Sequence, residues 1–319
     1  MPRIDADLVN RLGFVDDLSE SGFAYLMLAP IFLYVGVMAV WPLLRTFEMS
    51  LHQDAVGQAS QVGAFIGVDR YVGLFTGEYS VFVLRPLWDL SQPLKSAIVV
   101  TVVFAVVSVA LSTLLGFGQA LVLNMEFRGR KWFRTAIILP WTVPIVIQGM
   151  VFFMLFQPGI GGLYTVLHDL GLASEAPLAD SATSLGIIIV ADVWKQSAFM
   201  ALLILAGLQT IDHELYKVGR IAGASRWQRF RTITLPLVLP AVIVAIVFRT
   251  IGAMWIFGLI RTVTSCSTLP SLSCVVVDSF NNGYYGTAST VAFIQAGMVA
   301  LVLIGFVVYY FRGTTEVAS

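Results

Sequence analysis

Long apolar stretches limit the folds that this sequence can adopt. Six segments, each long enough to cross a bilayer as a helix, lie at 23–44, 96–123, 136–156, 184–208, 234–260 and 287–311. A helix of about 20 apolar residues spans the hydrocarbon core, and it satisfies all its backbone hydrogen bonds internally. Only 12% of residues are charged, whereas a soluble domain carries about 25%. We therefore predict an all-α membrane protein with six transmembrane helices. Pro140 and Pro144 are expected to bend the first turns of the third helix.

Basic residues predict which ends of these helices face the cytoplasm. Nine of the 19 Lys and Arg residues lie in two short links, 124–134 and 209–233, whereas the link 157–183 has none. By the positive-inside rule, both basic links are cytoplasmic. Six spans then place both termini inside as well.

The same reading divides the chain into one membrane domain with short extensions. Residues 1–22 form an acidic cytoplasmic lead-in, 23–311 the six-helix domain and 312–319 a cytoplasmic tail. The segment 48–93 is a long external loop, either a small cap or a flexible connector, and 209–233 is the main cytoplasmic loop. The acidic start and long first apolar run differ from a cleaved secretory signal.

Several function classes are excluded or disfavoured by what the sequence lacks. It has no G-x-x-x-x-G-K-[ST] loop, so the chain has no P-loop ATPase site of its own. Its zero formal net charge argues against a nucleic-acid footprint. No ligand spacing links its three histidines, so we expect no metal site. Cys266 and Cys274 lie in the external 262–286 loop, where either a disulfide or two inert thiols can occur.

A charged insert, residues 213–236, interrupts the apolar sequence between the fourth and fifth spans. Asp212 is placed to cap a short helix that carries Glu214 in its first turn. Gly223 can adopt the left-handed conformation that ends such a helix. Ser225 then opens a second helix, with Gln228 at the spacing of a capping box. Two helices joined by a glycine are typical of a surface that docks another protein.

The charged insert also resembles a known family. Its sequence ELYKVGRIAGASRWQRFRTITLP is similar to the cytoplasmic EAA loop of binding-protein-dependent ABC importer permeases of the maltose-type sugar group. The matching positions are Glu214, Leu215, Gly223, Ala224, Ser225, Trp227, Phe230, Ile233, Leu235 and Pro236. LAPIFLYVGVMAVWPLLRTFEMSL, FIGVDRYVGLF, LPWTVPIVIQGMVFFMLFQPGIG and VWKQSAFMALLILAGLQTID resemble other parts of the same permeases, so the resemblance covers nearly the whole chain.

The resemblance implies a type I ABC importer permease fold in a multi-pass protein of the bacterial cytoplasmic membrane. It also implies several partners: a second homologous permease, a dimer of ATPase subunits that use ATP and Mg, and an extracytoplasmic solute-binding protein. The insert would couple to the ATPase through Glu214, Leu215, Lys217, Gly223, Ala224, Ser225, Trp227 and Phe230. The sequence departs from the family at Lys217, where a glutamate is usual, and at Ala222, where an aspartate is usual.

Three ionisable residues lie inside predicted spans: Asp192, Lys195 and Arg249. Intramembrane charges are costly and usually face the bundle interior in pairs or in water. Helical spacing places Asp192 and Lys195 on one face of the fourth span, with Arg249 at a depth similar to that of Asp192. One carboxylate and two cations predict a cluster. It is either an ion pair that holds helices together or a polar wall of the substrate pathway.

Aromatic residues are the other candidates for the substrate pathway. Trp141, Trp194 and Trp255 offer stacking faces for a sugar ring, and Gln148 offers hydrogen bonds; packing is the more common use of such residues. The favoured function is therefore half of the translocation pathway of an ATP-driven importer of a sugar-like solute. An ion-coupled secondary transporter is the alternative, but it gives no reason for the charged insert. A membrane enzyme lacks a catalytic constellation.

Overall fold

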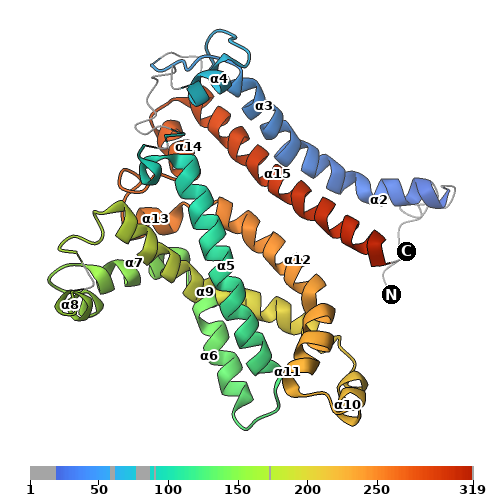
Figure 1. The fold of residues 1–319 in the computed structure, drawn as a ribbon. Coiled ribbons are helices and arrows are strands. Elements are labelled where there is room, and N and C mark those ends of the chain that lie inside the picture. The colour runs from blue at the N-terminus through green and yellow to red at the C-terminus, as the bar shows by residue number, and fades with distance from the viewer. Residues whose placement is uncertain (1–18, 58–61, 77–86, 90, 172–173, 318–319) are drawn as a thin grey trace, which may run out of the picture.

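The computed structural model describes residues 19–57, 62–76, 87–89, 91–171 and 174–317, and these are helical almost throughout. Figure 1 shows their arrangement. The helices are α2 (Glu20–Val35), η1 (Gly36–Val40), α3 (Trp41–Ser50), α4 (Asp69–Thr76), η2 (Pro93–Lys95), α5 (Ala97–Asn124), α6 (Arg130–Thr142), α7 (Ile145–Phe156), α8 (Gly162–Asp169), α9 (Ser181–Gln209), α10 (His213–Ile221), α11 (Arg226–Arg229), η3 (Phe230–Thr234), α12 (Leu235–Met254), α13 (Gly258–Val263), α14 (Leu272–Asn281) and α15 (Tyr285–Val317).

Five helices of the described chain are long and apolar enough to cross a membrane on their own. They run over Ser21–Ser50, Ala97–Asn124, Ser181–Gln209, Arg226–Met254 and Tyr285–Val308. A sixth span exists if the bent pair α6 and α7 is counted as one. The predicted all-α fold is confirmed, and the number of spans agrees on that count.

The third span, predicted over 136–156 with a bend at its prolines, is broken into two helices. It breaks between α6 and α7, which meet at 94°. Pro144 is the physical reason, because proline lacks the N–H that an unbroken helix needs and disfavours the helical conformation at the residue before it. Val143 accordingly takes an extended conformation, with φ −69° and ψ 126°.

The fifth span begins earlier and ends earlier than predicted. The helix continues without interruption from Arg226 to Met254, so the second helix of the charged insert and the fifth span are one element. The five-residue π-helix η3 joins them and ends two residues before Pro236. A π turn shifts the hydrogen-bond pattern and accommodates the missing N–H of proline. Beyond Met254 the chain forms the short helices α13 and α14, which occupy much of the predicted external loop 262–286.

Helices α5 and α9 form the centre of the molecule (Figure 1). They pack closely because Gly116 on α5 has no side chain where it faces α9. A Cβ atom there would lie 2.5 Å from the Met200 Cβ and 2.9 Å from the Ser197 carbonyl oxygen. Helix α12 and the short helices α13 and α14 complete this core.

The first span lies outside this core. Helix α3 packs against α15, and the apolar side chains of α2 are exposed in the isolated chain. A polar cluster fixes the end of α3 to the start of α15. Asp54 accepts hydrogen bonds from the backbone N–H and the hydroxyl of Thr287, at 3.0 and 2.6 Å, and pairs with the buried Arg70 at 3.5 Å. Most of the predicted lead-in 1–22 and parts of the loop 48–93 lie outside the described residues.

The close packing of α5 and α9 can be tested at two glycines of one helix. Gly116→Val places atoms where α9 already lies, whereas a Cβ added at Gly118 would meet no heavy atom within 4 Å. We expect Gly116→Val to cost about 1–3 kcal/mol of stability, the usual range for overpacking. Thermal unfolding in detergent measures this, with Gly118→Val as the control. Equal melting temperatures for the two variants would contradict the packing argument.

Candidate functional site

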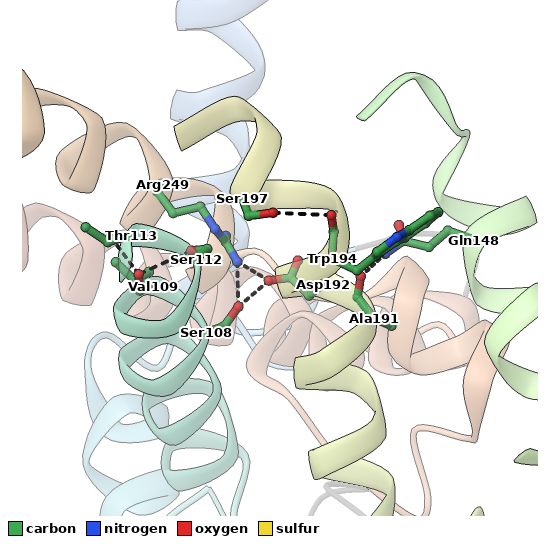
Figure 2. Close-up of polar contacts among 10 residues, drawn as sticks. All are labelled: Ser108, Val109, Ser112, Thr113, Gln148, Ala191, Asp192, Trp194, Ser197 and Arg249. Carbon is green, nitrogen blue, oxygen red and sulfur yellow. Dashed lines mark hydrogen bonds and ion pairs between the residues drawn. The ribbon is translucent and has the colours of Figure 1, made fainter. Parts of the chain in front are cut away.

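A buried ion-pair cluster of Ser108, Asp192 and Arg249 joins three membrane-spanning helices (Figure 2). Arg249 on α12 pairs with Asp192 on α9 through its Nη2 atom. The same nitrogen donates to the Ser108 hydroxyl on α5 at 2.7 Å, and that hydroxyl donates to the Asp192 carboxylate. Each member of the cluster therefore contacts the other two.

The burial of the cluster in this chain favours the first of the two interpretations that the sequence allows, an ion pair that holds helices together. Asp192 is 7% exposed and Arg249 3% exposed, so neither forms an open surface in this chain. A charge in an apolar interior needs a partner, because transferring it out of water costs several kcal/mol. The cluster therefore holds α5, α9 and α12 together. The predicted common depth of Asp192 and Arg249 is confirmed by their contact.

Lys195 lies near this cluster but makes its hydrogen bond elsewhere. Its Nζ atom donates to the backbone carbonyl of Val143 at 2.7 Å. Among the described residues, Asp192 forms its ion pair with Arg249. The expected cluster of one carboxylate and two cations is present in part: Arg249 pairs with Asp192 directly, and Lys195 interacts with Asp192 through its charge alone. Asp192 and Lys195 do start from neighbouring turns of one helix, but their side chains reach different helices.

Gln148 and the three tryptophans are divided between the interior and the exposed surface. Gln148 is 2% exposed, and its amide donates to the Ala191 carbonyl at 2.6 Å, so it joins α7 to α9. Trp141, Trp194 and Trp255 are 41–50% exposed as whole residues. Trp141 stacks on Phe199, and Trp194 lies against Phe152. The tryptophans keep free surface for a ligand, whereas Gln148 does not.

The charged insert has the local structure that its sequence predicts. Asp212 caps α10 by accepting the Glu214 N–H at 2.8 Å. Gly223 has φ +77°, a left-handed conformation that favours glycine. Ser225 and Gln228 form a reciprocal capping box at the start of α11. These three features fix the path of the chain between α10 and α11.

The insert presents apolar side chains to the exterior. Leu215, Val218, Ile221 and Trp227 are 43%, 63%, 88% and 67% exposed. The first three are spaced three residues apart on α10, so they lie along one side of the helix. Val218 and Ile221 were not among the predicted coupling residues, although their spacing from Leu215 was visible in the sequence. Exposed apolar residues on a short, capped helix are typical of a protein-binding surface.

Contacts with the membrane-spanning helices hold the insert in place. The Tyr216 hydroxyl lies 2.9 Å from the Thr234 hydroxyl of η3. Phe230 packs edge-on against Phe117 of α5 and stacks with Trp227. Lys217 donates to Glu214 at 2.6 Å, and both side chains are more than half exposed. These two residues therefore form a local ion pair on α10.

A disulfide lies among the short helices α13 and α14. It joins Cys266 to Cys274, whose Cα atoms are 5.6 Å apart. Among the described residues, no group of three or more His, Cys, Asp or Glu side chains is arranged to hold a metal ion.

Comparisons with known proteins agree with the fold and the insert. Residues 108–314 match the family described as binding-protein-dependent transport system inner membrane component. The trehalose/maltose transport system permease protein MalF of Thermococcus litoralis is 33% identical over 97% of this chain and 98% of its own. The trehalose transport system permease protein SugA of Mycobacterium tuberculosis is 30% identical over 91% of this chain and 89% of its own.

A solved structure extends the likeness to three dimensions. The crystal structure of a bacterial ABC transporter involved in the import of the acidic polysaccharide alginate aligns with a TM-score of 0.73, at 21% identity. The alignment covers 96% of this chain and 99% of that one, and it shows a shared fold. The chain is a multi-pass permease, as its helices indicate. It belongs to the family of binding-protein-dependent transport system permeases.

The buried ion-pair cluster predicts a specific pattern of mutant stabilities. Asp192→Leu or Arg249→Met leaves one buried charge without its partner, so we expect each to cost about 3–5 kcal/mol. The double variant removes both charges and should recover most of that loss. Thermal unfolding of the three proteins in lipid nanodiscs measures the coupling. A double variant that is as unstable as the sum of the two single variants would contradict it.

Proposed function

We propose that this chain is the transmembrane subunit of an ATP-driven importer and forms half of the translocation pathway for a sugar or sugar-like solute. The charged insert is the observation that carries the proposal. It is a capped, anchored helix pair with exposed apolar side chains, and it lies in a chain of the binding-protein-dependent family. Such a surface serves a protein partner, and the ATPase of the importer is that partner.

The charged insert can couple an ATPase to the membrane-spanning helices because it is rigidly connected to them. Helix α10 is held to η3 through Tyr216, and η3 is continuous with α12. A movement of a docked ATPase subunit would therefore be passed directly to the fifth span, and from it to α5 and α9 through the buried ion-pair cluster. This is rigid-body transmission, which needs a stiff contact rather than a catalytic group. ATP and Mg would be bound by the ATPase dimer, not by this chain.

The relatives support the assignment to sugars. Two of them are named as permeases for trehalose, or for trehalose and maltose. In this chain the exposed indole rings of Trp141, Trp194 and Trp255 provide apolar faces of the kind on which sugar rings stack. We assign these rings to the solute pathway. A second homologous permease would form the other half of that pathway.

The two faces of the chain are assigned to opposite sides of the membrane. The basic links 124–134 and 209–233 put the insert on the cytoplasmic side of the bacterial inner membrane. An extracytoplasmic solute-binding protein would then deliver the solute to the opposite face, where α8, α14 and the disulfide lie. A disulfide on that face fits an oxidising compartment.

One uptake experiment tests the function against the ion-coupled alternative. Membrane vesicles that contain this chain and the products of its neighbouring genes are supplied with radiolabelled trehalose or maltose and the solute-binding protein. We expect uptake that requires ATP hydrolysis and that continues when an ionophore removes the ion gradients. Uptake that follows the gradients and proceeds without ATP would overturn the proposal.

Gly223 provides a test of the insert as a coupling surface. No heavy atom lies within 4 Å of a Cβ built at Gly223, so a substitution acts only through the strained left-handed backbone. We expect Gly223→Val to leave the protein in the membrane but to abolish solute-stimulated ATP hydrolysis by the assembled complex.

Ala222→Val is the matched control, since Ala222 has an ordinary φ of −72°. It should retain stimulated hydrolysis. Normal stimulation in the Gly223→Val complex would remove the argument for docking through this turn.

The pair Glu214–Lys217 gives a second test at the same surface. Exposed ion pairs contribute only about 0–1 kcal/mol, and Lys217 is satisfied locally by Glu214. We therefore expect Lys217→Ala to bind the ATPase and transport almost normally, whereas Glu214→Ala should weaken both. ATPase co-purification and uptake rates are the measurements. If the lysine variant fails and the glutamate variant behaves normally, the roles are reversed.

A further inference from the structure

The break in the third span places the Val143 backbone carbonyl between the two helices. Two carbonyls near the end of α6 have local donors: the Val143 N–H donates to Pro140 at 3.3 Å, and the Thr142 hydroxyl donates to Leu139 at 2.8 Å. The Pro144 carbonyl accepts the Gln148 N–H at 2.9 Å. Val143 is extended, so its own carbonyl does not continue the hydrogen bonding of α6, and an unsatisfied carbonyl at membrane depth costs several kcal/mol.

Lys195 supplies the donor for this carbonyl. Its Nζ atom lies 2.7 Å from the Val143 oxygen, and the side chain is partly buried. The ammonium also lies at the C-terminal end of α6, where the helix dipole favours a positive charge. A lysine inside a span is costly. Lys195 donates its hydrogen bond to a neutral carbonyl and not to the nearby Asp192, and this choice requires a structural reason. The broken helix provides that reason.

The break also separates two packing units. Helix α6 packs on α9, where Trp141 stacks on Phe199 one turn from Lys195. Helix α7 packs on α13 so closely that a Cβ at Gly149 would lie 1.7 Å from the Thr262 hydroxyl. In Figure 1, α6 extends toward α10 and α11, whereas α7 runs toward α8 and α13. The residues 143–144 thus connect the part near the charged insert to the part at the opposite end.

We propose that Lys195 is a positioning residue that locks the bend of the third span by capping the Val143 carbonyl, and so fixes α7 and α13 relative to α6 and α9. Gln148 assists from the other side of the break through its bond to Ala191. This inference rests on the proposed function. In an importer, the lock would keep α7 and α13 in a fixed position relative to α6 and α9, which lie nearer to the ATPase. Lys195 acts through the backbone and does not touch the solute.

The contact itself can be tested in the unmodified chain. Val143–Pro144 is the only Val-Pro pair in the sequence, so labelling valine with ¹³C at the carbonyl and proline with ¹⁵N selects a single carbonyl signal. With ¹⁵Nζ-labelled lysine, solid-state NMR in lipid should show a dipolar coupling between this carbonyl and a lysine Nζ at roughly 4 Å. Absence of that coupling would overturn the proposal.

The consequence for the bend can be tested by electron–electron distance measurements in nanodiscs. Spin labels at Trp132→Cys on α6 and Ile160→Cys beyond α7 use two exposed positions, and the native cysteines are bonded to each other. Because α7 has 12 residues and is about 18 Å long, a change of about 20° in the bend moves its far end by roughly 6 Å. We expect Lys195→Met to shift or broaden the distance distribution by about this amount.

Two control variants distinguish loss of the Lys195–Val143 contact from a non-specific disturbance of the fold. Lys195→Arg keeps a cationic donor and should restore the original distribution, and Gln196→Met alters the adjacent residue and should leave it unchanged. An unchanged distribution in Lys195→Met, or no rescue by arginine, would overturn the proposal. Neither measurement involves transport, so failure of the importer assignment would be seen in the uptake experiment and not here.

Discussion

A charge inside a membrane protein must have a partner, and this requirement organises the centre of the molecule. Asp192 and Arg249 are almost fully buried, so each depends on the other and on Ser108 for its polar contacts. Together they tie α5, α9 and α12 into one unit. Residues next to Asp192 extend this role, because Ala191 accepts from Gln148 on α7 and Lys195 donates to Val143 after α6. A short stretch of α9 thereby contacts α5, α7, α12 and the end of α6.

The spans and the local form of the charged insert could be predicted from the sequence because they depend on neighbouring residues. Apolar length defines a span, and the cap at Asp212, the left-handed Gly223 and the capping box at Ser225 each use residues within three positions. The partner of Lys195 could not be predicted in this way. Helical spacing placed Lys195 near Asp192, but the competing acceptor, Val143, became available only because another span breaks.

Prolines act in two ways on the membrane-spanning helices, and only the bend in the third span was predicted from them. Pro144 follows an extended residue, and the third span turns sharply there. Pro42 and Pro236 each follow a π-helix that ends two residues earlier, and the helix continues through both. Each proline in a sequence marks a position where the backbone N–H of a helix is missing. Whether the chain bends or shifts its hydrogen bonds depends on the tertiary contacts available, such as the packing of Phe230 on Phe117.

The uninterrupted helix from Arg226 to Met254 has a mechanical consequence. Arg249 lies 23 residues beyond Arg226 on this helix, which corresponds to a lever arm of about 35 Å. If the salt bridge at Arg249 acts as the fulcrum, a tilt of about 10° displaces the exposed end by roughly 6 Å. A small rotation at the fulcrum thus corresponds to a stroke the size of a helical turn. With the fulcrum at Arg249, the exposed end moves through the largest distance, while the position of the helix beside Asp192 is kept.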